Sequence, residues 1–549
     1  MSQIKHLFSL ATLAILVVGC TDNIEDDFSI VDNTLYNPSF NYEFKEGLTV
    51  LGNRISIPYS IENLRAAFEL LPNDTKSGFT IDDIQPTHYY VRFCPKNEEE
   101  LDILINTPGL VLSETPLDRE VLIGGIYYHD PDLPPTQPTY QYSTLEIPFW
   151  KSLTDTLSVE HELLIEAYMP DDISNTKVSG KNQPLPDYLY HALLKEAYRI
   201  TGNVYEIVPE TKGSSWSPTG RIRAYDDIVG GYTPVRDVVI RGSRFLTVKE
   251  TTTDANGYFT LPSFNGSVSL KVVWEGDRWD VRNGNLGQAV YDGPTLSSGS
   301  WYLDIPSSLS ESRNISAVFR AARRVYMGYN YGLTKPSHSR KEKIAYIHDE
   351  IDDGINGDYN RQLGMGIWSD IRIAGKNING WRLVSDIFST TCHELGHAAH
   401  YTNSTSNYTN SEVRVLDSWA RFHQYLCTIK EYTELGVVSN LWNYTSGGIM
   451  IPDTRFNFQE FYPSTPYYQQ YTSLFIDIYD DYNQHDYMST YINDVVHGFP
   501  VSSLEGVVYN RTSFSEIKQH FLSIVNTTGY MFGMTVASID ELFSIYDGF

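Results

Sequence analysis

The chain has 549 residues, of which 41% are apolar and 20% are charged, and it carries a net charge of −27. The length exceeds what one hydrophobic core supports, so about two to four domains are expected. The acidic balance argues against a nucleic-acid-binding protein and against attachment to anionic lipids through basic patches, because both functions need clustered Lys and Arg.

The first 19 residues have the pattern of an export signal. A short positive region precedes an apolar run from Leu7 to Val18, which is too short to cross a membrane as a helix. The run ends in Leu-Val-Val-Gly-Cys, which resembles the lipobox of bacterial lipoproteins. This resemblance implies that the signal peptide, residues 1–19, is removed and that Cys20 is lipidated and anchors the chain to a membrane.

Residues 20–37 are predicted to form an acidic tether. Thr21 to Asp27 reads TDNIEDD, a composition typical of solvated, disordered segments. An acidic run directly after the lipidated Cys also resembles the export signal of surface lipoproteins in some Gram-negative bacteria. It implies a lipid-anchored protein of the outer membrane or cell surface. No other stretch is long and apolar enough to span a membrane.

Residues 38–215 mix two kinds of pattern. His88–Phe93 and Val121–Ile123 have the composition of strands, whereas Glu98–Ile105 and Tyr188–Tyr198 have helical periodicity. No motif in this region specifies chemistry. The pattern predicts an N-terminal accessory domain of mixed or β-rich structure.

Residues 216–285 have a clearer strand pattern. Strands are expected at Arg221–Tyr225, Pro234–Ile240 and Ser267–Trp274, and a strand, turn and strand at Thr251–Leu261, where Asp254, Asn256 and Gly257 supply the turn. The pattern G-x-I … P-V-x-x-V-x-I … T-x-T-D-x-x-G-x-F resembles the carboxypeptidase regulatory, transthyretin-like domain. The resemblance implies a β-sandwich that supports a neighbouring catalytic domain or binds partners.

Residues 286–549 shift toward helical patterns. Met365–Ile373 alternates like a strand, and helices are predicted at 412–433, 467–484 and 513–526.

One short stretch in this region specifies chemistry. Residues 393–397 read His393-Glu394-Leu395-Gly396-His397, the HExxH pattern. On a helix, positions i and i+4 lie on the same face. Both imidazoles can therefore reach one zinc ion, and Glu394 can reach a water molecule on that ion. A strand candidate, Met365–Ile373, shortly before such a helix resembles the arrangement in zincin proteases. The resemblance implies an edge strand that pairs with extended peptide through backbone hydrogen bonds.

The residues around the motif are compatible with a helix. Ser385 or Asp386 is the predicted N-cap, and the apolar positions that follow include Ile387 and Phe388. Gly396 costs a helix about 1 kcal/mol relative to Ala, so a packing reason for this glycine is expected.

Two carboxylates are candidates for the third protein ligand that a catalytic zinc ion normally has. Glu412 and Asp417 both lie on the next predicted helix, Glu412 to Leu435. Because they are five residues apart, they are separated by about 140° around the helix. One of them can face the zinc ion, but not both.

The stretch HELGHAAH … VLDSWARF resembles the gluzincin metallopeptidases, the thermolysin-like group, and zincin-like lipoproteins that carry E-S-W-A at this place. By this resemblance Asp417 is the third ligand, and the helix must lie closer to the metal because Asp is one methylene shorter than Glu. The enhancin-like metallopeptidases are the rival template, in which Glu412-Val413 supplies the ligand.

Other titratable residues are candidates for supporting roles. His400 is expected behind the metal ligands or on the surface, since a fourth protein ligand would close the site. One of Asp477, Asp480, Asp481 and Asp494 could orient a ligand imidazole, and His485, His497 or a late tyrosine could stabilise an oxyanion. Cys392 and Cys427 are interpreted as buried free thiols, with a disulfide between them as the alternative.

The sequence thus predicts a multidomain α+β protein whose C-terminal region, 286–549, is a mostly helical zincin-like domain. The predicted activity is that of a zinc metalloendopeptidase acting on protein or peptide substrates, with His393, His397 and Asp417 as zinc ligands and Glu394 as the catalytic base. The alternative is a non-catalytic surface-binding or adhesion lipoprotein on a zincin scaffold.

Overall fold

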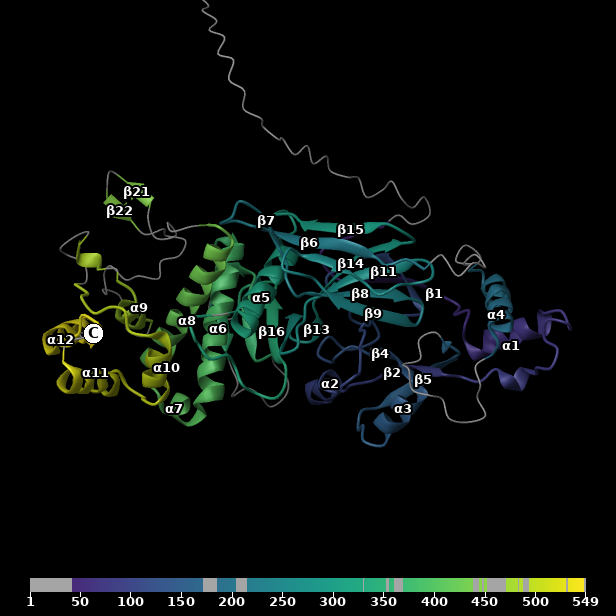
Figure 1. Cartoon of the computed structure of the whole chain (residues 1–549), viewed down its shortest axis with the longest axis horizontal. Coiled ribbons are helices and arrows are strands. Elements are labelled where there is room, and N and C mark those ends of the chain that lie inside the picture. Colours follow the sequence, from purple (N-terminus) through teal and green to yellow (C-terminus); the bar gives the residue numbers. More distant parts are fainter. Residues whose placement is uncertain are drawn as a thin grey trace, which may run out of the picture. The chain divides into compact units, whose positions relative to one another are not determined.

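The computed structural model of the chain describes residues 42–170, 185–203, 215–328, 330–351, 355–359, 369–437, 444–446, 449–451, 471–481, 483–486, 493–529 and 532–547. They form a multidomain α+β protein with several β-sheets and a mostly helical C-terminal region (Figure 1). The predicted signal peptide 1–19, the lipidation site Cys20 and the tether 20–37 lie outside these residues. Over the described ranges, no helix has both the length and the apolar character needed to cross a bilayer.

The N-terminal region contains a three-stranded antiparallel sheet in the order β4-β2-β5. Its central strand is His88–Phe93, as predicted. The predicted helix Glu98–Ile105 is also confirmed, and the Asn97 side chain caps its first turn. The elements of this region are β1 (Val50–Arg54), α1 (Ile61–Leu70), η2 (Ile81–Asp83), β2 (His88–Phe93), α2 (Glu98–Ile105), β3 (Arg119–Ile123), β4 (Gln141–Glu146), α3 (Ile147–Thr154), β5 (His161–Ala167) and α4 (Asp187–Ile200).

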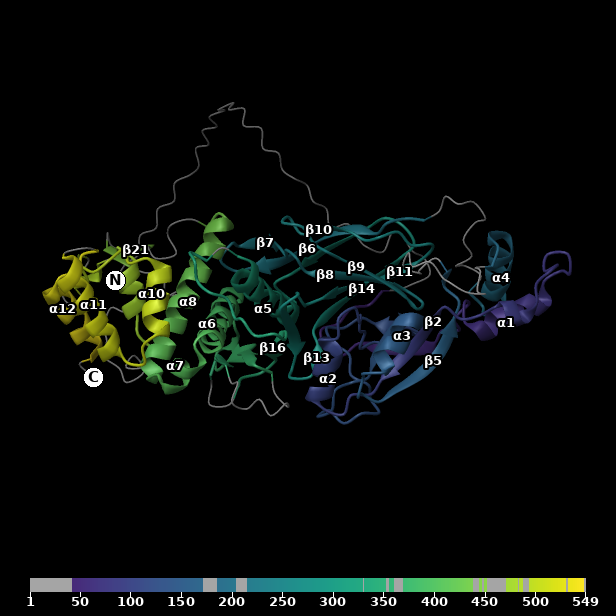
Figure 2. The ribbon, with the colours of Figure 1, turned by 60° about the horizontal axis from the view of Figure 1, so that its bottom comes forward.

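Buried side chains of two further sheets belong to one hydrophobic core. Figure 2 shows strands of these sheets, among them β6, β8, β9 and β11, in the middle part of the chain. Along β6, Ile222 and Ala224 are buried while Arg221 and Arg223 alternate with them on the outer face, which is the period-2 pattern of a half-buried strand. The first sheet has the order β10-β6-β15, with β7 also on β6, and the second has the order β14-β11-β8-β9. Their strands are β6 (Thr219–Asp226), β7 (Gly231–Pro234), β8 (Val239–Arg244), β9 (Thr247–Thr252), β10 (Tyr258–Thr260), β11 (Val268–Val273), β14 (Val290–Leu296) and β15 (Ser300–Ile305).

The predicted turn between β9 and β10 forms at the expected residues. Asp254 accepts hydrogen bonds from the backbone N–H groups of Asn256 and Tyr258. Gly257 has φ +81°, and a Cβ there would lie 2.4 Å from the carbonyl oxygen of Ile222. Only glycine fits, because the backbone conformation and the close approach of β6 both exclude a side chain.

These two sheets extend beyond residue 285, where the sequence pattern ended the sandwich. β14 pairs with β11, and β15 runs parallel to β6. In the sequence, strand β12 (Trp279–Asn283) comes after β11 and before β14 and β15, but it pairs with β16 in a different sheet. A chain that leaves a sheet and returns to it carries no local signal for doing so, because pairing partners are fixed by tertiary contacts.

A five-stranded sheet in the order β13-β12-β16-β18-β17 follows. Of the predicted strand Met365–Ile373, only residues 369–373 are described, and the strand there is Ile371–Ala374. It is an inner strand, parallel to β16 and antiparallel to β17, so β17 is the edge strand on this side among the described elements. The other strands of this sheet are β13 (Gly287–Gln288), β16 (Glu342–Ile347), β17 (Gly357–Tyr359) and β18 (Ile371–Ala374). Strands β19 (Lys376–Asn377) and β20 (Gly380–Trp381) form a separate two-stranded sheet.

The C-terminal region is built around α6, which lies beside α5 and α8 (Figures 1 and 2). The predicted helices 412–433 and 513–526 are confirmed as α8 and α11. The elements are α5 (Ser310–Met327), α6 (Val384–Asn403), α7 (Thr405–Asn410), α8 (Val413–Glu434), β21 (Tyr444–Ser446), β22 (Ile449–Ile451), α9 (Leu474–Tyr479), η8 (Gln484–Asp486), α10 (Val501–Tyr509), α11 (Phe514–Thr528) and α12 (Val536–Asp547).

The helix predicted at 467–484 is confirmed only in part, because within its described residues α-helix covers Leu474–Tyr479 alone. Before it, the backbone N–H of Thr472 donates to the Ser418 hydroxyl, and the Ser473 hydroxyl lies 2.8 Å from that of Tyr546. After it, Asp480 is extended. Tertiary hydrogen bonds therefore override the local helical pattern.

Candidate metal centre

The first turn of helix α6 is capped by a residue from a distant part of the chain. The helix begins after Leu383, whose side chain cannot cap it. Asp227, in the turn that follows β6, accepts hydrogen bonds from the Ser385 backbone nitrogen at 3.0 Å and from the Ser385 hydroxyl at 2.7 Å. The prediction that Ser385 or Asp386 is the N-cap is therefore wrong. The carboxylate at this helix N-terminus belongs to Asp227, a residue far away in the same chain.

The preceding residue, Asp226, joins the helices that pack against α6. It is fully buried, and its Oδ1 accepts hydrogen bonds from the backbone nitrogens of Ile228 and Val229. Its Oδ2 accepts hydrogen bonds from Arg320 on α5 at 2.9 Å and from the Tyr432 hydroxyl on α8 at 3.0 Å. One turn of the sandwich region thus fixes all three helices.

Replacing Asp227 with alanine is expected to lower the free energy of unfolding by about 1–2 kcal/mol, because the first turn of α6 loses its capping carboxylate. Urea unfolding followed by circular dichroism measures the change. Asp155→Ala is the matched control, since Asp155 is exposed and its removal should leave stability nearly unchanged. Equal stability of the Asp227 and Asp155 variants would contradict a capping role.

The contact between α6 and α8 explains the glycine inside the motif. A Cβ at Gly396 would lie 2.8 Å from the Cβ of His423 and 3.2 Å from the Cα of Ala420. The two helices therefore approach too closely for any side chain at this position. This is the packing reason that the sequence led us to expect, and it brings α8 within reach of the histidines.

His393, His397 and Asp417 converge at this contact. The Nε2 atoms of the two imidazoles are 3.2 Å apart, and the Nε2 of His397 lies 3.4 Å from the Oδ1 of Asp417. One ligand atom from each of the three residues lies within 4.8 Å of the others, which is close enough to hold one metal ion. Within the described ranges, this is the sole group of three such residues with that spacing.

The electrostatic environment leaves both imidazoles in the form that binds metals. Burial lowers the pKa of His393 well below its usual value and lowers that of His397 to about 4. Both rings are therefore neutral at pH 7, with lone pairs available for coordination. Burial also raises the pKa of Asp417 to about 6.

Glu394 lies beside the cluster, in the space between α6 and the edge strand β17. It is 5% exposed, and a Cβ at Gly357 would lie 3.0 Å from its Oε1. Burial raises the pKa of Glu394 well above its usual value, and the carboxylates of Asp358 and Asp417 raise it further. Buried negative charges that oppose each other in this way are relieved by a cation, so the donor set fits a bound metal ion.

A tyrosine takes the place expected for an orienting carboxylate. The hydroxyl of Tyr408, on α7, lies 3.3 Å from the Nδ1 of His397, which leaves the Nε2 of that ring for the cluster. Asp477, one of the four candidates for this role, instead accepts hydrogen bonds from Ser473 and Tyr546. Sequence reasoning missed Tyr408, because nothing distinguishes it among 40 tyrosines.

Two further aromatic rings border the cluster. The ring of Tyr359, on β17, is nearly parallel to that of His397, at 6.5 Å between centroids. The ring of Tyr471 is centred 5.4 Å from that of His393, and its hydroxyl donates to Gln424 on α8 at 2.6 Å. A tyrosine ring thus lies near each of the two histidines.

Glu412, the rival third ligand, lies elsewhere. It is the N-cap residue of α8, is exposed, and accepts a hydrogen bond from the backbone nitrogen of Phe514 at 3.3 Å. It is absent from the group of converging residues. Helix α8, which begins after Glu412 and contains Asp417, therefore turns Asp417 toward the histidines and not Glu412.

The other candidates also lie apart from the cluster. His400, on α6 itself, is buried and stacks on Tyr509 with 4.6 Å between ring centroids, so it lies in the interior instead of on the surface. His497 is exposed, and neither it nor His485 joins the cluster. Cys392 and Cys427 are buried free thiols, as interpreted from the sequence.

The sequence matches no known family model and no curated protein. Any functional conclusion must therefore come from the geometry and chemistry of the site itself.

Proposed function

We propose that this protein is a zinc-dependent metallopeptidase held at the cell surface by a lipid anchor. The observation that carries the proposal is the convergence of His393, His397 and Asp417 beside the buried carboxylate of Glu394. Two neutral imidazoles and one carboxylate are the donor set of catalytic zinc sites that keep a position open for water or substrate.

His393, His397 and Asp417 would hold the zinc ion. When bound, zinc supplies Lewis acidity that lowers the pKa of water toward about 7 and polarises a carbonyl group. A softer metal is disfavoured, because the three residues offer nitrogen and oxygen donors and no thiolate. The shorter side chain of Asp417 is accommodated by the close packing of α8 against Gly396.

Glu394 would act as the general base and then as the general acid. It would take a proton from the attacking water and pass it to the leaving amine. A raised pKa suits the first step, since such a carboxylate accepts a proton more readily than an exposed one.

The edge strand β17 supports a peptide as substrate. It pairs with β18 on one side, and no partner strand lies on its other side among the described elements. Gly357 and Tyr359 place this strand directly beside Glu394 and His397. An extended peptide that added to this edge by backbone hydrogen bonds would lie across the cluster. The same arrangement of edge strand and ligand helix resembles that of zincin proteases.

The location at the outer membrane or cell surface rests on the sequence alone. The apolar run that ends at Cys20 and the acidic residues after it are the features that support a lipid anchor and surface export.

Peptide hydrolysis by the purified chain tests the proposal. The full chain in detergent is incubated with a fluorescence-quenched peptide library, as purified, after removal of metal with a chelator, and after zinc is returned. Hydrolysis should disappear with the chelator and return with zinc. Cleavage that persists in the chelated protein would contradict a metal-dependent mechanism.

A second candidate function, binding without turnover, is favoured by one surface. On the outer face of the sheet β10-β6-β15, Tyr258 and Tyr302 are 46% and 56% exposed and flank Arg221. Exposed tyrosine and arginine side chains are enriched at interaction surfaces. The two candidates differ in whether the metal centre turns over a peptide.

A further inference from the structure

The outer face of the sheet β10-β6-β15 carries a row of aromatic and cationic side chains. Arg221 on β6 lies opposite Tyr258 on β10 and opposite Tyr302 on β15, so the three residues form a row across three adjacent strands. The guanidinium carbon of Arg221 is 5.5 Å from the centre of the Tyr258 ring and 5.9 Å from that of the Tyr302 ring. Because side chains alternate along a strand, this row lies opposite the core face, where Ile222 and Leu303 are buried.

A second row repeats these residue types two residues along β6. Arg223 lies opposite Asp304 on β15, and its guanidinium carbon is 5.5 Å from the centre of the Tyr232 ring. Tyr232 packs edge-on against Tyr225, with 6.1 Å between ring centroids. Three tyrosines of the two rows are more than a third exposed to solvent: Tyr232 (40%), Tyr258 (46%) and Tyr302 (56%).

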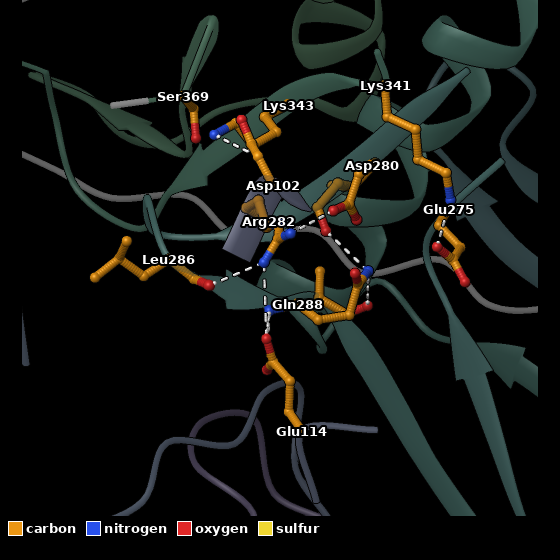
Figure 3. Close-up of polar contacts among 12 residues, drawn as sticks. Asp102, Glu114, Glu275, Asp280, Arg282, Leu286, Gln288, Lys341, Lys343 and Ser369 are labelled. Carbon is orange, nitrogen blue, oxygen red and sulfur yellow. Dashed lines mark hydrogen bonds and ion pairs between the residues drawn. The ribbon is translucent and has the colours of Figure 1, made fainter. Parts of the chain in front are cut away.

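Arg221 differs from other cations of this part of the chain in its lack of a carboxylate partner. Around strand β12, for example, Arg282 lies 2.6 Å from Asp280, and Lys341 lies 2.8 Å from Glu275 (Figure 3). Arg221, in contrast, forms no ion pair with any residue that the structure describes. Its charge is therefore available to an anion from outside the chain.

The guanidinium group of Arg221 is also accessible. Its Nη1 donates a hydrogen bond of 3.4 Å to the exposed Tyr258 hydroxyl, whereas its Nη2 is not buried and has no partner in the described part of the chain. Arg223 is neutralised by Asp304, which it contacts at 2.6 Å. The two rows together therefore carry one positive charge in excess, although the whole chain has a net charge of −27.

The arrangement of the sheet excludes a partner that adds as a strand at this face. β6 is paired on both sides, with β15 on one and with β10 and β7 on the other, so its backbone groups are used within the sheet. A partner must therefore contact side chains: tyrosine rings, the Arg221 guanidinium group, and the hydroxyls of Thr219 and Ser300 in the adjoining row. Sugars suit these groups, because their C–H faces are attracted to the negative face of an aromatic ring and their hydroxyls form hydrogen bonds.

We propose that this face binds a saccharide that carries carboxylate groups, such as an oligouronate. Sugar rings would stack on Tyr258 and Tyr302, and a sugar carboxylate would pair with the outer nitrogens of Arg221. The negative charges elsewhere on the chain oppose this binding only weakly, because salt at physiological concentration screens exposed charges beyond about 8 Å. The metal centre takes no part, since its ligands lie on α6 and α8.

Calorimetric titration of the purified full chain with trigalacturonate tests this proposal. Trigalacturonate should bind saturably. Its fully methyl-esterified form, which has the same sugar rings without the charge, should bind at least about tenfold more weakly, equivalent to about 1.4 kcal/mol. Triglutamate, which has carboxylates without sugar rings, should not saturate. A chelator should leave the affinity for trigalacturonate unchanged, because the face contains none of the metal-binding residues.

Two substitutions separate the contribution of the charge from that of the rings. Arg221→Gln should remove the preference for trigalacturonate over its methyl ester. Tyr302→Ala should weaken the binding of trigalacturonate by about tenfold or more, because one stacking ring is lost. Both side chains lie on the solvent face of the sheet, so both variants should fold, which circular dichroism checks.

Tyr188→Ala is the matched control for Tyr302→Ala. Tyr188 lies on α4, away from the sheet, and is 57% exposed, almost as much as Tyr302. The control should bind trigalacturonate like the unchanged chain. The proposal is overturned if trigalacturonate fails to saturate, if the methyl ester or triglutamate binds equally well, or if folded Tyr302→Ala binds as tightly as Tyr188→Ala.

Discussion

Alanine in place of His393 or Asp417 should leave the purified protein without zinc, whereas the unchanged chain should carry about one zinc ion per molecule. Each of these residues contributes one of three converging ligand atoms, so its removal leaves only two. Loss of a residue that merely supports a metal ligand already costs about 10–100-fold in affinity. Loss of a ligand should cost more. Elemental analysis after equilibration with buffered zinc measures the stoichiometry and the affinity.

Glu412→Ala is the matched control for Asp417→Ala. Both carboxylates lie at the start of α8, but Glu412 is exposed and contacts the backbone of Phe514 instead of the histidines. It should therefore keep a full complement of zinc. If Glu412→Ala loses zinc and Asp417→Ala keeps it, the third ligand has been misassigned. If the unchanged chain takes up no zinc, the metal centre itself is wrong.

The sequence was sufficient to predict the part of the site that depends on helix periodicity. His393 and His397 share a face because they are one helical turn apart, and this is independent of the rest of the fold. The same periodicity shows that only one of Glu412 and Asp417 can face the metal ion, but not which of them does. That depends on the rotation of α8 about its axis, which is set by the packing of Ala420 and His423 against Gly396.

The contacts that support the site could not be predicted, because they join residues far apart in the chain. Asp227 caps α6 from the sandwich region, and Gly357 brings β17 against Glu394. A local pattern predicts the wrong cap, Ser385 or Asp386, because both residue types cap helices well in isolation. The pairing of β15 with β6 across a long connection is a further contact that no local pattern marks.

The cap on α6 changes how the sandwich region should be regarded. As a domain recognised by its strand pattern, it could be an inert spacer. In the structure, its Asp226 and Asp227 hold α5, α6 and α8, and the core of its two sheets is continuous with that of the helices. Removing this region would therefore remove contacts that hold in place the helices that carry His393, His397 and Asp417.

Glutamine in place of Glu394 should keep the zinc ion and lower kcat/KM for peptide hydrolysis by about 10²–10⁴-fold, the usual contribution of a general base. Glutamine has nearly the same shape as glutamate but cannot take a proton from water. Zinc content should be unchanged, since Glu394 is not one of the three converging residues. Activity and metal content measured on the same preparation separate loss of the base from loss of the metal.

Stability provides a further readout for this variant. Burial and the carboxylates of Asp358 and Asp417 raise the pKa of Glu394, so its charged form is disfavoured in the metal-free protein. The metal-free Glu394→Gln variant, which has a neutral side chain at this position, should therefore unfold at a temperature no lower than that of the unchanged, metal-free chain. Glu99→Gln, at an exposed position, is the control for the loss of one carboxylate and should keep full activity. A Glu394→Gln protein that binds zinc and hydrolyses peptides normally would exclude Glu394 as the base. If both the unchanged chain and the variant hold zinc and neither hydrolyses peptide, the protein is better explained as a binding protein without turnover. The exposed tyrosines Tyr258 and Tyr302, on the outer face of the sheet β10-β6-β15, are then the residues to replace next.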